Sequence, residues 1–245
     1  METAFRRPEC LAEVPFRYCP GCGHGIVTRL VAEVVDELGI RGRCVGIAPV
    51  GCSVYVEEYF DWDMVGAAHG RAPAVATGIK RVLPDHTVIS YQGDGDLAAI
   101  GTAEIIHAAN RGEEITVVYV NNGVYGMTQG QMAPTTIIGQ RTATTPEGRD
   151  PNQQGYPLRV CELLATLEGA VYIARGTVAS PKNVRITKRM IRKALQTQMD
   201  KSGFSLVEVL SSCPTQWGVK PVDAMQWIDK EMAPYYGLGE IKSPA

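Results

Sequence analysis

Residues 91–122 constrain the fold of this chain more than any other stretch, because two strand-like runs there each end in a polar motif. The first run ends at Gly93-Asp94-Gly95, a helical segment follows, and the second run ends at Asn121-Asn122. Glycines let backbone N–H groups approach phosphate oxygens, and the start of a helix favours negative charge. Parallel strands would bring Asp94 and Asn122 to one sheet edge, where carboxylate and amide oxygens bind Mg²⁺. The stretch therefore predicts a site for a phosphorylated cofactor and a hard cation.

Strand-like and helical segments alternate along the whole chain. Short apolar runs predict strands at 43–48, 87–91, 115–120, 170–174 and 204–210. Helical spacing of apolar residues predicts helices at 26–38, from 69, and at 97–110, 159–167, 181–201 and 222–232. This alternation predicts an α/β fold with a doubly wound, mostly parallel sheet. We expect a single domain over residues 1–245 with a core of about 16–212, an irregular N-terminal arm and an irregular C-terminal arm over 213–245.

The composition excludes several classes of protein. Hydrophobic residues make up 45% of the chain and charged residues 20%, which is typical of a globular protein and not of a disordered one. A formal charge of −2 gives no support for a nucleic-acid surface. We find no apolar run long enough for a membrane span and no signal-peptide core, so we expect no membrane association and a cytoplasmic protein. Seven cysteines in such a protein favour metal or redox use over disulfides.

Four of the cysteines lie in motifs that could share one site. Cys19 and Cys22 form a C-x-x-C pair, whose two thiolates can reach one metal centre from a single turn. Cys52 follows one predicted strand and Cys213 follows another, so both would lie at the same edge of a parallel sheet. Four thiolates suit either a Zn²⁺ site or a 4Fe-4S cluster, and the spacing does not decide between them. Cys10 has no assigned role.

Taken together, these motifs resemble those of a known family. The segments YCPGCGHG, GCS and SSCPT, with GDG and NN separated by 25 residues, are similar to the β subunit of 2-oxoacid:ferredoxin oxidoreductases of the 2-oxoisovalerate or 2-oxoglutarate type. The resemblance implies a thiamine diphosphate-binding domain of the pyrophosphate-binding (PP) type. It also implies that the proximal 4Fe-4S cluster is held by Cys19, Cys22, Cys52 and Cys213.

The resemblance assigns further residues to the cofactor. Mg²⁺ would be held by Asp94, Asn122 and the main-chain carbonyl of Val124. Thiamine diphosphate would contact the set Gly93, Asp94, Gly95, Asp96, Asn122, Val124, Met127 and Thr128. Within this set, Gly95 and Asp96 would act through backbone N–H groups and Thr128 through its hydroxyl. Met127 would form an apolar wall, and plain core packing is an equal interpretation for it.

His69, in the sequence AHGRA, is the histidine that we expect to act as an acid or base, or to face the substrate. Histidine suits proton transfer because its ordinary pKa lies near neutral pH. The alternative is a helix-capping or hydrogen-bonded structural histidine.

The reaction implied by the resemblance is the coenzyme A-dependent oxidative decarboxylation of a 2-oxoacid to acyl-CoA and CO₂, with reduction of ferredoxin, or the reverse. In thiamine enzymes, a glutamate from a separate domain activates the pyrimidine of the cofactor. We find no second α/β domain here to supply that glutamate. We therefore expect an α subunit to complete the site, in some relatives with γ and δ subunits, and no activity from this chain alone.

The segment after Cys52 bears on the substrate. Some relatives that use 2-oxoglutarate have a lysine there, which can pair with the distal carboxylate. This chain reads GCSVYVEEYF, with Glu57 and Glu58 and no lysine. Repulsion of a second carboxylate would favour a branched apolar acid such as 2-oxoisovalerate. The alternatives are 2-oxoglutarate as substrate, a non-oxidative thiamine decarboxylase subunit that would not need the cysteines, and a zinc-binding assembly protein.

Overall fold

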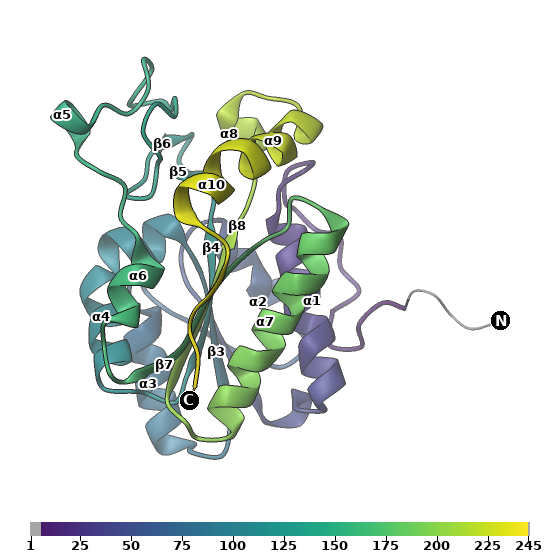
Figure 1. The fold of residues 1–245 in the computed structure, drawn as a ribbon. Helices are drawn as coiled ribbons and strands as arrows, with labels where there is room; N and C mark the ends of the chain where they lie inside the picture. Colours follow the sequence, from purple (N-terminus) through teal and green to yellow (C-terminus); the bar gives the residue numbers. More distant parts are fainter. Residues whose placement is uncertain (1–5, 245) are drawn as a thin grey trace.

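The computed structural model describes residues 6–244, which form a seven-stranded sheet with helices on both faces (Figure 1). The strands lie in the order β2-β1-β3-β4-β8-β7-β9. Neighbouring strands are parallel except for β7 and β9, which are antiparallel. Their bounds are β1 (Cys44–Ala48), β2 (Asp63–Gly66), β3 (Thr87–Gly93), β4 (Thr116–Asn121), β7 (Ala170–Thr177), β8 (Phe204–Leu210) and β9 (Gly239–Lys242). The predicted α/β fold with a mostly parallel sheet is confirmed.

Two layers of helices cover the sheet, and each layer encloses its own apolar core (Figure 1). One core contains residues of α1 (His24–Leu38), α2 (Val56–Tyr59) and α7 (Pro181–Met199). The other core contains residues of α3 (Ala72–Val82), α4 (Thr102–Asn110) and α6 (Val160–Ala165). Removing both sets of side chains from water stabilises the sheet from its two faces.

Local sequence signals explain where the longest helices begin and end. α1 ends at Gly39, which adopts a left-handed conformation with φ 63° that glycine takes without steric cost. α7 begins at Pro181, and the side chain of Ser180 caps it by accepting a hydrogen bond from the N–H of Asn183 at 3.3 Å. Its buried side chains, including Ile191 and Leu195, recur at helical spacing.

The helix predicted over 97–110 is broken in two. A π-helical segment, Gly95–Ile100, follows β3, and α4 starts only after Gly101. A Cβ at Gly101 would lie 2.5 Å from the carbonyl oxygen of Asp96 and 2.8 Å from that of Gly70. Two backbone segments therefore approach so closely here that a side chain has no room.

The prediction of an irregular C-terminal arm over 213–245 is wrong for the described residues. The segment folds into α8 (Pro214–Trp217), α9 (Pro221–Trp227), a π-helical turn (Ile228–Met232), α10 (Ala233–Tyr236) and β9, which pairs with β7. Like β2, which the sequence also failed to predict, β9 is a four-residue edge strand whose residues are only partly buried or exposed. Such strands carry no apolar alternation. The N-terminal arm, by contrast, has no regular helix or strand over residues 6–23.

Residues 123–157 form a protruding loop with little regular structure. It contains β5 (Val124–Tyr125), β6 (Gln131–Met132) and α5 (Pro151–Gln154). The buried side chain of Arg149 organises it by donating hydrogen bonds to five carbonyl groups, those of Pro134, Thr136, Gln154, Gly155 and Tyr156. These bonds give hydrogen-bond donors to backbone carbonyl groups of the loop that are not paired in a helix or sheet.

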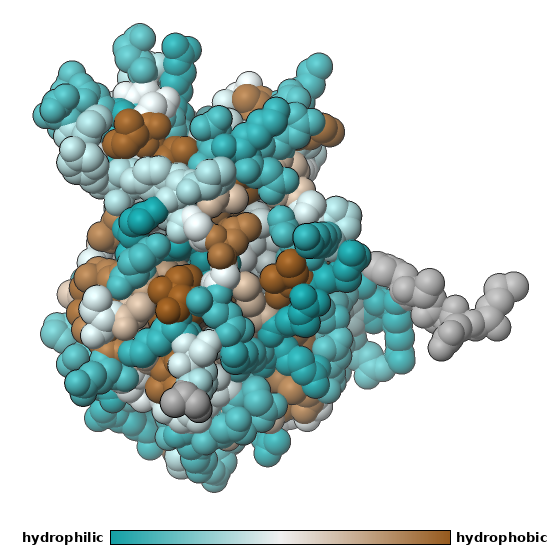
Figure 2. Space-filling view, viewed as in Figure 1, coloured by the Kyte–Doolittle hydropathy of each residue, from teal (hydrophilic) through white to brown (hydrophobic). Residues whose placement is uncertain are grey.

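The loop and the C-terminal helices form two protrusions with a hollow between them (Figure 2). A cavity of about 570 Å³ lies between these elements, with Ile138 and Arg141 on one side and Trp217 and Trp227 on the other. Within residues 6–244, none of the helices has the length and apolar character needed to cross a membrane.

Candidate functional site

A second cavity, of about 270 Å³, lies at the carboxyl ends of β1, β3 and β4. Its wall contains residues 50–53 after β1, 93–96 at the end of β3, and Asn122 with residues 124–128 after β4, together with His24 and His69. The edge of the sheet therefore gathers the GDG motif, the NN motif and Cys52 at one place. Each of the predicted cofactor-binding residues lines this cavity: Gly93, Asp94, Gly95, Asp96, Asn122, Val124, Met127 and Thr128.

Asp94 and Asn122 lie next to each other at the ends of the neighbouring strands β3 and β4. The carboxylate of Asp94 is buried, accepts a hydrogen bond from the N–H of Gly95 at 2.8 Å and also interacts with the N–H groups of Asn122 and Gly123. Burial raises the pKa of Asp94 to about 7, although these hydrogen bonds oppose the shift. A buried carboxylate of this kind fits a bound cation, which would keep it ionised.

The side chain of Asn122 shapes the turn that follows it. Its Oδ1 atom accepts a hydrogen bond from the N–H of Val124 at 3.2 Å. Asn121 makes the equivalent contact with the N–H of Gly123 at 3.1 Å. The two asparagines thus hold the turn that carries the amide and the main-chain carbonyl expected to bind Mg²⁺.

The other cofactor candidates differ in what they offer to the cavity. Gly95 packs so closely on Tyr125 that a Cβ would lie 2.9 Å from the ring, so this position admits only backbone. Met127 is 45% exposed and lines the cavity, which excludes core packing for it. The hydroxyl of Thr128 donates a hydrogen bond to Gln131 at 2.6 Å, so a diphosphate would have to compete for it.

The side chain of Asp96 contacts His69, which the GDGD motif did not predict. Its buried carboxylate accepts hydrogen bonds from the N–H of Gly70 at 2.7 Å and from Nε2 of Gln92 at 2.6 Å. The same carboxylate lies 2.6 Å from Nδ1 of His69. His69 is therefore oriented by a carboxylate, and Nε2 is the ring nitrogen left for the cavity.

The four candidate cysteines come together from three segments. A Cβ placed at Gly126 would lie 3.4 Å from Sγ of Cys213, 3.6 Å from Sγ of Cys52 and 4.0 Å from Nδ2 of Asn122. Besides burial, the charge of Cys19 raises the pKa of Cys52, and the charges of Cys52 and Cys19 raise the pKa of Cys22. The charges of Cys22 and Cys52 in turn raise the pKa of Cys213. Two of the four cysteines and the side chain of Asn122 therefore meet at Gly126.

The environment of these thiols fits ligands of a cluster. Burial raises the pKa of Cys22 and of Cys213 to about 12, so each would stay protonated unless bound iron offsets the cost of a buried thiolate. Within residues 6–244, no group of three or more His, Cys, Asp or Glu side chains is arranged around a single metal ion. A 4Fe-4S cluster binds each of four thiolates at a different iron atom, so four cysteines are the number of protein ligands that such a cluster takes.

Two residues next to these motifs complete the polar lining. Ser53 is buried, and among residues 6–244 its hydroxyl has no hydrogen-bond partner, although it lines the cavity. An unpartnered buried hydroxyl at this place fits a polar cofactor. His24 is buried, contacts the hydroxyl of Tyr91 at 3.0 Å and has its pKa lowered to about 4 by burial, so it is neutral near pH 7.

One expectation from the sequence needs correction, and the location of one unassigned cysteine can be given. Glu57 and Glu58 do not line the cavity, since both are exposed on α2 and Glu58 pairs with Arg17 at 2.8 Å. Repulsion by these glutamates therefore cannot select the substrate. Cys10 is buried in the apolar core beside α1, where it has no access to the cavity.

Family models and similar proteins point to the same part of the fold. Residues 49–209 match the family model described as thiamine pyrophosphate enzyme, C-terminal TPP binding domain. This range includes Cys52 and both cofactor motifs, whereas Cys19, Cys22 and Cys213 lie outside it.

The chain is 52% identical over 232 residues to the ketoisovalerate oxidoreductase subunit VorA of Methanothermobacter thermautotrophicus, covering 95% of this chain and 49% of that protein. It therefore spans about half the length of that relative. It is 39% identical over 221 residues to the 2-oxoglutarate synthase subunit KorB of Methanocaldococcus jannaschii, covering 88% of this chain and 77% of that protein.

Among solved structures, similarity extends to a 2-oxoglutarate:ferredoxin oxidoreductase from Magnetococcus marinus with 2-oxoglutarate, coenzyme A and succinyl-CoA bound. The TM-score is 0.79 at 32% sequence identity, and the match covers 93% of this chain and 73% of that one.

Proposed function

Since the chain belongs to the thiamine diphosphate-binding subunits of the 2-oxoacid:ferredoxin oxidoreductases, we propose that it serves as the β subunit of an enzyme that oxidatively decarboxylates a 2-oxoacid. The products would be acyl-CoA, CO₂ and reduced ferredoxin, and the same residues would serve the reverse reaction. The observation that carries this proposal is the contact of Gly126 with both groups of residues. Cys52 and Cys213 on one side and Asn122 on the other all lie within 4.0 Å of its Cβ position.

Different residues at the cavity would bind the cofactor, bind the cluster and transfer a proton. Thiamine diphosphate, when bound, supplies a carbanion that attacks the 2-oxo group. Asp94, Asn122 and the carbonyl of Val124 would hold its Mg²⁺, and the N–H groups after Asp94 would face the diphosphate. Cys19, Cys22, Cys52 and Cys213 would hold the 4Fe-4S cluster that accepts electrons one at a time.

His69 would move a proton at Nε2. Its Nδ1 atom is engaged by the carboxylate of Asp96 at 2.6 Å, and 36% of its side chain is exposed toward the cavity it lines. A histidine held in this way presents a defined tautomer to a substrate, which is what general acid-base catalysis requires.

The apolar rim of the cavity favours a branched apolar substrate. Val50, Ile100 and Met127 line the cavity and are 41%, 50% and 45% exposed. A second carboxylate would lose hydration against such a rim, whereas an isopropyl group would gain apolar contact. We favour 2-oxoisovalerate over 2-oxoglutarate, in agreement with the higher identity to the ketoisovalerate relative.

Partners would complete the enzyme. An α subunit would contribute the pyrimidine-binding domain, with γ and δ subunits in some arrangements, and coenzyme A and ferredoxin would be the co-substrates. This chain would form one thiamine diphosphate-binding domain of that assembly. Its cysteines are all free, which agrees with a reducing cytoplasm.

Anaerobic co-purification with the partner subunits tests the proposal. The complex should reduce ferredoxin in the presence of coenzyme A and a 2-oxoacid, fastest with 2-oxoisovalerate in a panel that includes 2-oxoglutarate. Protein without iron that still decarboxylates would favour a non-oxidative thiamine enzyme, and zinc without thiamine would favour an assembly protein. If no 2-oxoacid reduces any acceptor, the proposed function is wrong.

A further inference from the structure

Residues 233–242, which we call the C-terminal strap, return the end of the chain to the sheet. The strap consists of α10, a short connection and β9, which pairs with β7 through Ala174 opposite Glu240 and Arg175 opposite Gly239. In Figure 1 it runs as the yellow segment from the C-terminal helices down along the edge of the sheet. Tyr236 at its start is 2% exposed, so the strap is anchored by a buried aromatic ring.

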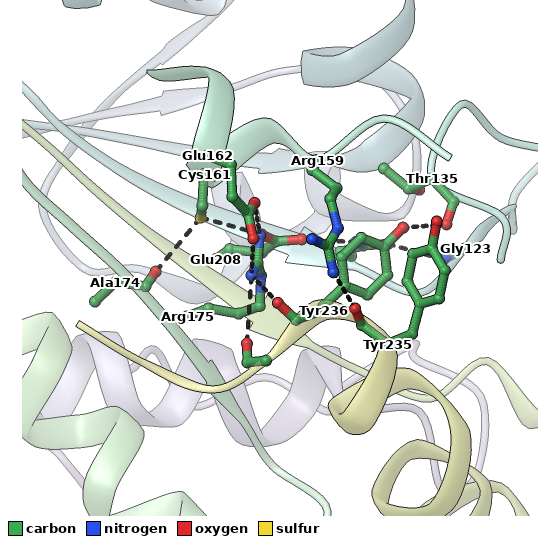
Figure 3. A network of polar contacts seen from close by, with 12 residues as sticks. Gly123, Thr135, Arg159, Cys161, Glu162, Ala174, Arg175, Glu208, Tyr235 and Tyr236 are labelled. Carbon is green, nitrogen blue, oxygen red and sulfur yellow. Dashed lines mark hydrogen bonds and ion pairs between the residues drawn. The ribbon is translucent and has the colours of Figure 1, made fainter. Parts of the chain in front are cut away.

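Arg175 fastens the strap to the sheet. Its guanidinium donates hydrogen bonds to the carbonyl groups of Tyr236 and Gly237 and lies 5.2 Å from the centre of the Tyr236 ring (Figure 3). The side chain is 1% exposed and forms an ion pair with Glu208 at 2.7 Å. A second ion pair, with Glu162 at 2.6 Å, completes its contacts on the α6 side. A fully buried guanidinium with this many partners is rigidly placed.

The contacts of Arg175 continue as a hydrogen-bond network in two branches. One branch reaches the turn formed by Asn121, Asn122 and Gly123. Glu208 accepts a hydrogen bond from Nδ2 of Asn121 at 2.7 Å, and Oδ1 of Asn121 accepts one from the N–H of Gly123 at 3.1 Å. Asn122, the proposed cation ligand, is the residue between Asn121 and Gly123. The ion pair of Glu208 and Arg175 thus braces the turn that carries the ligand.

A second branch reaches Asp94. The hydroxyl of Tyr236 donates a hydrogen bond to the carbonyl of Thr135 (Figure 3). The hydroxyl of Thr135 in turn donates to Oδ2 of Asp94 at 3.4 Å. The hydroxyl of Tyr236 also interacts with the side chain of Asn121, so it contacts both branches.

We propose that the C-terminal strap positions the two cation ligands, Asp94 and Asn122, and that Tyr236 is the positioning residue through which it acts. This inference rests on the proposed function, because it assumes that these ligands bind Mg²⁺ and thiamine diphosphate. Replacing a residue that orients a metal ligand by a hydrogen bond, without contacting the metal itself, commonly lowers metal affinity by about 10–100-fold. Tyr236 lies two contacts from Asp94, so the lower end of this range is expected.

The test compares Tyr236→Phe with Tyr235→Phe in the complete complex. Both changes delete one phenol hydroxyl from neighbouring residues of α10, and among residues 6–244 the Tyr235 hydroxyl has no bond to this network. The affinity for Mg²⁺–thiamine diphosphate is measured by calorimetric titration of cofactor-depleted complex, alongside iron content and the midpoint of thermal unfolding. We expect Tyr236→Phe to weaken cofactor binding about 10-fold, with unchanged iron content, and Tyr235→Phe to leave it unchanged.

A second pair of variants keeps the test independent of folding effects at position 236. Thr135→Val removes the hydroxyl that contacts Asp94, whereas Thr135→Ser retains it. The valine variant should weaken cofactor binding and the serine variant should preserve it, with kcat at saturating cofactor similar in both. If the unaltered complex binds cofactor and Tyr236→Phe binds it as tightly as Tyr235→Phe, the role of the strap is refuted. If the unaltered complex binds no thiamine diphosphate, the proposed function fails and this inference fails with it.

Discussion

Replacing Asp96 with asparagine would test whether the GDGD motif serves the cofactor or His69. The carboxylate of Asp96 has three donors around it: the N–H of Gly70, Nδ1 of His69 and the side-chain amide of Gln92. Asparagine offers only one acceptor oxygen, so in the present arrangement its NH₂ group faces at least one of these donors. Gln92 could relieve that clash only by turning over, which would require the Ser90 hydroxyl, now a donor to the Gln92 carbonyl at 3.0 Å, to accept a hydrogen bond instead.

The size of the effect follows from these contacts. One hydrogen bond to a charged, buried acceptor contributes about 1.5–3 kcal/mol to the free energy of unfolding. For a chain of this length, each kcal/mol lowers the midpoint of thermal unfolding by roughly 2–4 °C. The catalytic effect should be larger, because a histidine that loses its orienting carboxylate loses the roughly 10²–10⁴-fold that general acid-base catalysis contributes.

The assay is coenzyme A-dependent reduction of ferredoxin by the complete complex, with thermal unfolding measured in parallel. We expect kcat to fall about 10²–10⁴-fold in Asp96→Asn while cofactor binding changes little. Ser90→Ala is the matched control. It removes the hydroxyl that donates to Gln92, at the far end of the buried hydrogen-bond series Ser90–Gln92–Asp96, and leaves His69 and Asp96 in contact. A kcat within about twofold of the unaltered enzyme, together with a lowered unfolding midpoint, would refute the role given to His69.

Three further outcomes are expected. Asp94→Ala should abolish retention of thiamine diphosphate and leave iron content largely intact, because the cysteines come from other segments; loss of both would show that the two sites are not separable or that Asp94 is structural. Gly101→Ala should lower the free energy of unfolding by about 1–3 kcal/mol in urea titrations, since its Cβ would lie 2.5 Å from a backbone oxygen. Burial raises the pKa of Glu33, but hydrogen bonds from Lys188 and Arg29 outweigh it and hold the pKa below its ordinary value. The stabilisation that these bonds give is complete above the ordinary pKa of about 4.5 and is lost as the pH falls through the lowered value. Glu33→Gln should therefore cost about 0.5–1 kcal/mol at neutral pH and progressively less as the pH falls below 4.5.

The central part of the fold could be predicted because its signals are local. Buried parallel strands are short continuous apolar runs, and β1, β3, β4, β7 and β8 all lie where such runs were found. The sites at their ends follow from topology, since parallel strands place Asp94, Asn122 and Cys52 at one edge. Spacing alone left open what the four cysteines hold, and the 4Fe-4S cluster proposed for them rests on the family resemblance.

The residues that orient the site could not be predicted in the same way. The contact of His69 with Asp96 joins positions 27 residues apart through a loop whose path depends on Gly70 and Gly101. Arg175 and Glu208 did leave a signal, because each is a charge inside an otherwise apolar strand. Such charges are buried only when paired, so two of them in neighbouring strands predict an ion pair. Their connection to the strap was hidden, since β9 has no strand-like pattern.

The order of the strands explains how the end of the chain can influence a site built near its middle. β8 lies between β4 and β7, and Glu208 on β8 is aligned with Tyr119 on one side and Arg175 on the other. From that position its carboxylate contacts both Asn121, at the end of β4, and Arg175, which holds the strap. The two proposed cation ligands, Asp94 and Asn122, directly follow β3 and β4, yet the residues that support them are complete only when β8, the next-to-last strand, and the strap have been added. A cofactor that binds only this finished arrangement would stabilise the C-terminal part of the sheet along with the loops it touches.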